Sequence, residues 1–265
     1  MKIDYQEPLD DLQTRIDIHN QYGGKDIDKW MLEILEPEKG IKILDAGCGA
    51  GKLCFSFYDY LKGECEITGG DLSEELLARA RQENQQKNAS IKFLHLDFNQ
   101  PFDLPDNAFD LVSCSFAIYY AADIPFTIGE MHRVLKPGGR LFTTGPMPEN
   151  KQLFYDIIHT ATQQPIPPMP GSSRYNSQIL SAIKDLFSNV EVEIFENPLT
   201  FTSADPFLSY TRASLSEDRR LWKDLFSEMD FETVMQKIAL ETQKRIDKDA
   251  ELVMTKVVGG FIATR

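Results

Sequence analysis

Residues 43–53, with the sequence ILDAGCGAGKL, decide the fold of this chain. An apolar run leads into Asp45, and the three alternate glycines Gly47, Gly49 and Gly51 follow before a helical pattern begins. Because glycine has no side chain, it permits a tight turn and lets a ligand approach the backbone closely. This strand–loop–helix pattern predicts a ligand site made largely from main chain.

Short apolar runs alternate with helical patterns on both sides of this loop. The spacing of Ile124, Ile128, Met131 and Leu135, for example, places four apolar side chains on one helical face. Alternation of strands and helices predicts an α/β fold, with a mostly parallel sheet covered on both faces. We predict strands at residues 41–46, 66–70, 91–96, 109–113, 140–144, 190–195 and 256–263.

The remaining patterns suggest two accessory regions. Residues 1–36 contain two amphipathic helical patterns, which we interpret as N-terminal capping helices before a domain at 37–265. Residues 164–171 are rich in proline and predict a loop. Because the mostly helical residues 204–248 lie between two predicted strands, we expect an insertion at about 197–253 that forms a helical lid.

Two more carboxylates follow predicted strands. Asp71 ends the second strand, 22 residues after Gly49, where its two oxygens suit the two hydroxyls of a ribose. Asp97 follows the third strand and precedes Phe98, a pair suited to an adenine amino group and an adenine ring face. Parallel strands end at one edge of a sheet, so Asp45, Asp71 and Asp97 should lie close together. Each carboxylate taken singly is also consistent with a helix cap.

Five segments resemble, in order, the motifs of class I S-adenosylmethionine-dependent methyltransferases: LDAGCGAGKL, GGDLSEELLARAR, LHLDFNQPF, FDLVSCSFAIYY and EMHRVLKPGGRLFTTGP. The resemblance covers residues 25–146 in detail and the closing strands more loosely. It implies a Rossmann-like, doubly wound sheet of seven strands, with an antiparallel last strand and helices on both faces. It also implies S-adenosylmethionine as the cofactor and S-adenosylhomocysteine as the product.

The same resemblance implies a role for each matching residue. The first acidic residue and the glycine loop would hold the methionine end, the second acidic position the ribose and the third the adenine. The backbone after the fourth strand would accept a hydrogen bond from the cofactor's ammonium group. The cofactor-binding residues expected on this basis are Asp45, Gly47, Cys48, Gly49, Asp71, Leu72, Asp97, Phe98, Ser115 and Phe116.

Two other functions compete with methyl transfer. An NAD(P)-dependent oxidoreductase also has a glycine-rich turn, but here Lys52 stands where its GxGxxG motif requires glycine. Asp45 would repel a pyrophosphate and would favour a cationic ligand. The second alternative is a catalytically silent S-adenosylmethionine-binding protein, because every residue assigned from the motifs contacts the cofactor and none the acceptor.

The candidates on the acceptor side are single residues. Tyr119 follows the fourth strand, where this family places residues that face the transferred methyl, so it either orients an acceptor or forms a pocket wall. His19 and Tyr22 of the N-terminal region are candidates for catalysis, with packing in the core as the alternative. Arg174 and Arg212 are candidates for binding a carboxylate, with solvent exposure as the alternative.

Charge and composition narrow the range of partners. The formal net charge is -13 and the sequence pI about 4.8, so nucleic acid and anionic membrane surfaces are disfavoured. No secretory signal and no run of about 20 apolar residues occurs, which favours a cytoplasmic protein. The chain lacks the Asn/Asp-Pro-Pro-aromatic motif of many nucleic-acid and protein-amide methyltransferases. We therefore expect an O- or N-methyltransferase acting on a small molecule, and the sequence does not indicate the oligomeric state.

Cysteine and histidine usage predicts no metal. The four cysteines have no CxxC spacing, and the four histidines are scattered without a ligand-like pair.

Overall fold

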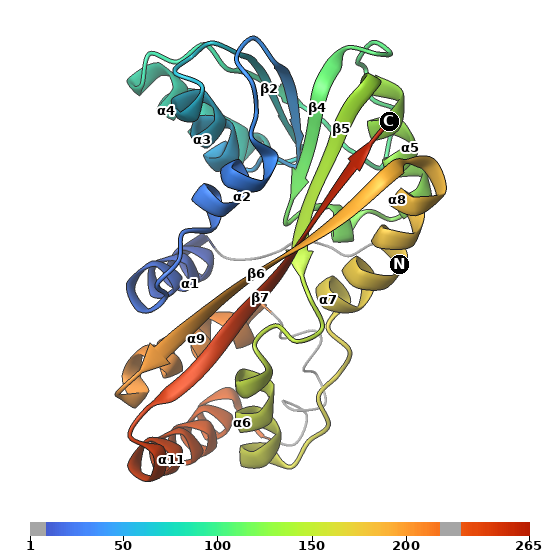
Figure 1. Cartoon of the computed structure of the whole chain (residues 1–265). Coiled ribbons are helices and arrows are strands. Elements are labelled where there is room, and N and C mark those ends of the chain that lie inside the picture. The colour runs from blue at the N-terminus through green and yellow to red at the C-terminus, as the bar shows by residue number, and fades with distance from the viewer. Residues whose placement is uncertain (1–8, 218–228) are drawn as a thin grey trace.

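The computed structural model describes residues 9–217 and 229–265, and Figure 1 shows a twisted sheet whose two longest strands run out of it into a group of helices. The strand order is β3-β2-β1-β4-β5-β7-β6. Neighbours among β1 to β5 pair in parallel, whereas β7 is antiparallel to both β5 and β6. The predicted seven-stranded, mostly parallel sheet is confirmed. Its strands are β1 (Lys42–Ala46), β2 (Glu66–Asp71), β3 (Lys92–His95), β4 (Phe109–Ser115), β5 (Leu135–Pro146), β6 (Ser188–Phe201) and β7 (Leu252–Thr264).

Helices cover both faces of the sheet (Figure 1). On one side lie α2 (Ile27–Leu35), α3 (Lys52–Tyr60) and α4 (Glu74–Gln86), and on the other α5 (Ile124–Val134), α7 (Pro170–Arg174) and α8 (Leu180–Leu186). Successive strand residues face opposite sides, so Leu141 packs in the core under α5 and Phe142 in the core under α3. Both side chains are fully buried, which explains why the central strands have continuous apolar runs.

Strands β6 and β7 extend beyond the sheet and form the base of a lid. The pairing of β5 with β7 ends at Pro146 and Val258, but β6 and β7 stay paired as far as Phe201 and Leu252. Four helices pack around this extension: α1 (Leu9–Tyr22), α6 (Gln152–Thr162), α9 (Ala204–Glu217) and α11 (Phe231–Asp249). We call the extension and these four helices the lid.

The lid differs from the expected insertion at 197–253. Because the strands remain hydrogen-bonded through residues 197–201 and 252–253, the helical connection between them is shorter. Residues 218–228 of the predicted helical block lie outside the described residues. The sequence patterns also missed α6 and the helical residues 170–186, which include η2 (Tyr175–Ile179). The proline-rich segment between α6 and α7 contains no helix or strand until Pro170, in agreement with the predicted loop.

The two N-terminal helices belong to different layers. α2 packs in the core beside α3, whereas α1 packs against α9 and β6 of the lid. Asn197 of β6 holds the connection between α1 and α2. Its side chain accepts a hydrogen bond from the Lys25 backbone nitrogen and donates one to the Lys25 carbonyl. Residues 1–8 of the predicted capping region lie outside the described part of the chain.

Tyr175 links α7 and α8 to the sheet and offers a test of the packing. It is fully buried, and its ring stacks on the Phe261 ring with the two centroids 4.3 Å apart. Its hydroxyl donates a hydrogen bond to the Thr143 carbonyl at 2.7 Å. We expect Tyr175→Phe to lower the free energy of unfolding by about 1–2 kcal/mol, since it removes the hydrogen bonds of the tyrosine hydroxyl with the carbonyl and the hydroxyl of Thr143. Urea denaturation measures the change, with Tyr60→Phe on the surface as control. Equal stabilities of the two variants would contradict the assigned hydrogen bonds.

In the part of the chain that the structure describes, no helix is both long enough and apolar enough to cross a membrane.

Candidate cofactor and acceptor site

The glycine loop joins β1 to α3, and each of its glycines has a positive φ. A Cβ on Gly47 would lie 2.6 Å from the Cβ of Ala117, so the protein itself requires glycine there. At Gly49, a Cβ would meet nothing within 4 Å. The loop therefore packs at Gly47 against Ala117, which follows β4, and faces open space at Gly49.

Asp71 fixes this loop to the end of β2. One carboxylate oxygen accepts a hydrogen bond from the Gly49 backbone nitrogen, and the other accepts from the Ser73 backbone nitrogen, both at 2.8 Å. A carboxylate oxygen has capacity for about two hydrogen bonds, so each still has room for a ligand hydroxyl. Leu72, the next residue, is 55% exposed and presents an apolar surface beside the carboxylate.

Asp97 and Phe98 lie beyond the end of β3, which stops at His95. One oxygen of Asp97 accepts from both the backbone and the side-chain amide of Asn99, at 2.9 Å each. An atom of the Phe98 ring lies 3.4 Å from the position of a Cβ on Gly47. The structure thus brings Phe98 next to the glycine loop, as expected for residues that follow parallel strands at one edge of a sheet.

Asp45 is the residue whose position differs from the expectation. Its carboxylate is buried at 2% exposure and accepts hydrogen bonds from the Ser113 hydroxyl at 2.6 Å and the Cys54 thiol at 3.4 Å. Burial raises the pKa of Asp45 to about 6, against the opposing effect of those two hydrogen bonds. Direct contact with a ligand is not available to Asp45 in this arrangement. Asp45 lies in β1, two residues before Gly47, so its charge can reach a ligand at the loop only through its electric field.

The side chains of Cys48 and Ser115 contact neighbouring groups of the protein. The Cys48 side chain is buried in the core under α3, and its backbone nitrogen donates to the Gly70 carbonyl at 3.0 Å. The Ser115 hydroxyl points to the sulfur of Met31, 3.7 Å away. Both residues can contribute main-chain atoms, but their side chains serve packing.

Phe116 follows β4 in the left-handed region, with a φ of 55°. Its backbone nitrogen donates to the Thr144 carbonyl at 3.0 Å, which holds this turn to β5. Ala117, which contacts the glycine loop, was missed in the sequence analysis, because a single alanine after a strand carries no signal.

These features together fit a cationic nucleoside. The open space at Gly49, the carboxylate of Asp71 and the ring of Phe98 surround one edge of the sheet, and the buried Asp45 precedes the glycine loop. A ribose, an adenine and an ammonium group each find a suitable partner there. No group of three or more His, Cys, Asp or Glu side chains arranged to hold a metal occurs among residues 9–217 and 229–265.

The three predicted catalytic residues fall into two places. Tyr119 lies in η1 (Ile118–Tyr120), where its ring packs on Tyr120 at 4.8 Å and its carbonyl accepts from Arg174 at 2.6 Å. His19 and Tyr22 lie on α1, inside the lid. The structure shows contacts of each with lid residues rather than with Tyr119.

His19 packs edge-on against Tyr210 of α9, with ring centroids 5.4 Å apart, and Tyr22 packs on Phe201 at 5.1 Å. Burial, followed by the charges of Lys256 and other nearby cations, lowers the pKa of His19 to about 2. A histidine of such low pKa is neutral near pH 7 and is a weak proton acceptor. In this state His19 is poorly suited to the predicted role of general base.

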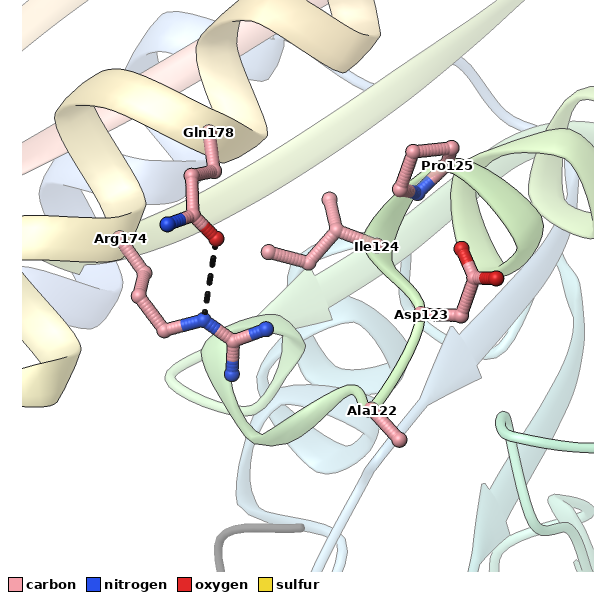
Figure 2. Close-up of a pocket in the computed structure, with 6 residues that line it drawn as sticks. All are labelled: Ala122, Asp123, Ile124, Pro125, Arg174 and Gln178. Carbon is pink, nitrogen blue, oxygen red and sulfur yellow. Dashed lines mark hydrogen bonds between the residues drawn. The ribbon is translucent and has the colours of Figure 1, made fainter. Parts of the chain in front are cut away.

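The two candidate arginines are already occupied. Figure 2 shows Arg174 bonded to Gln178 beside a pocket at the start of α5, and the same guanidinium donates to the carbonyls of Tyr119 and Ala121. Arg212 forms two hydrogen bonds with the Glu232 carboxylate. The pocket in Figure 2 lies between the start of α5 and the helical residues Arg174 and Gln178, and it contains none of the predicted cofactor residues.

Comparison with known proteins finds a family match for most of this chain. Residues 37–196, more than half of the chain, match a family model described as "Methyltransferase domain". The chain is 34% identical over 131 residues to a demethylmenaquinone methyltransferase of Thermus thermophilus. That match covers 49% of this chain and 58% of the relative, so the similarity spans little more than half the length of that protein.

Two solved structures are similar in fold. The YcgJ protein of Bacillus subtilis has a TM-score of 0.59 at 16% identity, over 90% of this chain and 97% of its own. Phosphoethanolamine N-methyltransferase 2 of Haemonchus contortus, solved with S-adenosyl-L-methionine, has a TM-score of 0.57 at 18% identity. That match covers 96% of this chain and 56% of the other.

Proposed function

Since this chain belongs to the methyltransferase domain family, we propose that it transfers the methyl group of S-adenosylmethionine to an oxygen or nitrogen of a small-molecule acceptor. One observation carries the proposal. The glycine loop leaves open space at Gly49, whose backbone nitrogen is held by the carboxylate of Asp71. The buried carboxylate of Asp45 lies in the strand that leads into this loop. A positively charged nucleoside suits that arrangement better than a pyrophosphate does.

Each part of the cofactor has a proposed partner. Asp71 accepts from the ribose hydroxyls, while Leu72 and Phe98 cover the adenine with apolar surface and Asp97 accepts from its amino group. Main-chain atoms of Gly47, Cys48 and Gly49, together with those around Ser115 and Phe116, hold the methionine end. Asp45 contributes its charge through its electric field.

The bound cofactor supplies an activated methyl group with a good leaving group. The chain's own task is then to align the acceptor with that methyl and to exclude water. The lid stands beyond the edge of the sheet where β5 ends, so we place the acceptor between that edge and the lid. Tyr119 forms a wall of this space, and His19 and Tyr22 shape it from the lid.

A small-molecule acceptor agrees with the acidic net charge of the chain, which disfavours nucleic acid. The named activity of the Thermus relative, methylation of demethylmenaquinone, is also methylation of a small organic molecule.

The buried charge of Asp45 predicts a pH dependence of cofactor binding. If the ionised form binds the cationic cofactor, affinity should be full near pH 7.5 and should fall as pH drops through about 6, to about one tenth at pH 5. The Asp45→Asn variant should bind weakly and with little change over this range. Calorimetric titration with S-adenosylmethionine at pH 7.5, 6 and 5 measures the affinity of both proteins as a function of pH. Parallel curves for the two proteins would show that Asp45 does not supply the charge.

The proposed reaction is tested by methyl transfer itself. Protein supplied with S-adenosylmethionine carrying a radiolabelled methyl group should move the label into a compound of a small-molecule metabolite extract. Binding of S-adenosylhomocysteine with no labelled product from broad extracts would favour a cofactor-binding protein without activity.

A further inference from the structure

Lys256 is a lysine in an otherwise apolar part of β7. Lys256 lies two residues before Val258, which pairs with Pro146, the last residue of β5. It therefore stands just beyond the edge of the main sheet. Its ammonium group is 5.3 Å from the centroid of the Phe116 ring. The residue thus faces the point where the proposed cofactor site meets the lid.

The charge of Lys256 is not neutralised by the described part of the chain, in which it forms no ion pair. Asp28 is the carboxylate whose field reaches it, and that carboxylate is already paired with Lys52 at 2.9 Å. The ring of Phe116 offsets only part of the cost of burying a cation. Removing an ammonium group from water without a counter-ion is unfavourable.

Further basic groups lie on the same side of the lid. Lys151, at the start of α6, has its ammonium group 5.1 Å from the Phe154 ring and 5.7 Å from the Tyr210 ring. His19 also packs against Tyr210, edge-on, and its Nδ1 atom is buried with no hydrogen-bond partner. We call Lys256, Lys151 and Arg15 the cationic cluster; the neutral His19 lies beside it.

The members of the cluster affect one another. Burial lowers the pKa of Lys256 to about 8, with further lowering by the charges of Lys52, Arg15 and Lys151. The charges of Lys256, Lys151 and Arg15 likewise add to burial in lowering the pKa of His19. Lys256 thus holds its charge in a desolvated position, within reach of the charges of Arg15 and Lys151. A ligand with negative charge relieves that repulsion.

We propose that the cationic cluster, with Lys256 as its central contact, binds a negatively charged oxygen group of the methyl acceptor. The proposal rests on the proposed function and specifies its substrate class: a small molecule that carries a carboxylate or a phosphate. The acceptor is favoured over the cofactor's own carboxylate because the cluster is built from α1, α6 and the β7 extension. The predicted cofactor residues lie instead on β1, β2 and β4 and in the connections that follow β1 to β4.

The test uses the full chain saturated with S-adenosylhomocysteine, with benzoate and phenyl phosphate as anionic probes and benzamide as the neutral probe. At constant ionic strength, at least one anion should raise the Tm of the wild type, and benzamide should not. Lys256→Met should weaken the apparent affinity for that anion at least tenfold, whereas Lys256→Arg should retain most of it. Lys237→Met, which removes an exposed charge from α11, is the matched control and should behave as wild type.

Without any ligand, Lys256→Met should have a Tm equal to or above that of the wild type, because the substitution removes a desolvated charge. A purely structural lysine would instead leave the variant less stable. The proposal is overturned if neither anion stabilises the wild type more than benzamide does, or if Lys256→Met responds to the anion as the wild type does.

Calorimetric titration with S-adenosylhomocysteine distinguishes failure of the acceptor proposal from failure of the proposed function. Lys256→Met should bind it within about threefold of the wild type. A loss of more than tenfold would assign the cluster to the cofactor carboxylate and contradict the acceptor proposal. Failure of the wild type to bind S-adenosylhomocysteine would contradict the proposed function itself.

Discussion

Replacing Asp71 with alanine should lower the affinity for S-adenosylhomocysteine by about 100-fold or more. The substitution removes the acceptor that holds the Gly49 backbone nitrogen at 2.8 Å and both oxygens proposed to bind the ribose. A hydrogen bond to a charged group contributes about 1.5–3 kcal/mol. Two such bonds lost from the complex amount to about 3 kcal/mol or more, which corresponds to a factor above 100 in Kd.

Calorimetric titration measures this effect, and Asp59→Ala is the matched control. Asp59 is an exposed aspartate whose ion pair with Lys87 is 3.4 Å long, so its removal should leave the cofactor affinity unchanged. The Tm of both variants shows that they are folded. A folded Asp71→Ala protein with wild-type affinity would contradict the proposed contact between Asp71 and the ribose.

A pair of alanine substitutions in the glycine loop should separate folding from binding. Both glycines have positive φ, so alanine carries a backbone cost of about 1–2 kcal/mol at either position. At Gly47 the new Cβ would also lie 2.6 Å from Ala117, and we expect a much larger loss of stability there. At Gly49 the methyl group meets no protein atom within 4 Å and projects into the space assigned to the cofactor.

Gly49→Ala should therefore remain folded and lose at least 100-fold in affinity for S-adenosylhomocysteine, whereas Gly47→Ala should have a Tm many degrees lower. Thermal denaturation and calorimetric titration of the two variants measure both effects. Unchanged binding by Gly49→Ala would show that the ligand does not approach this part of the loop.

The alternation of strands and helices, the mostly parallel sheet and the meeting of the glycine loop with Asp71 were predictable because each depends on local patterns and on the geometry of parallel strands. The burial of Asp45 was not. Asp45 is buried because its carboxylate packs against Cys54 and Ser113. Ser113 is 68 residues away in the sequence, and Cys54 carries no pattern that indicates this contact.

The shape of the lid depends in the same way on distant contacts. The apolar pattern of residues 190–195 indicated a strand but not its continuation to Phe201, which follows from pairing with β7. A helix at Gln152–Thr162 is buried through contacts with α11, more than 60 residues away. Lys256 had a visible signal, a single lysine within an apolar strand, but its meaning required the position of Phe116.

The central claim, that the edge of the sheet around Gly49 and Asp71 binds an adenosyl amino acid, is tested most directly by calorimetric titration of the wild-type protein with S-adenosylhomocysteine and, separately, with NAD and NADP. The account predicts saturable binding of one S-adenosylhomocysteine per chain and no heat from either dinucleotide. Binding of NAD or NADP without binding of S-adenosylhomocysteine would contradict it.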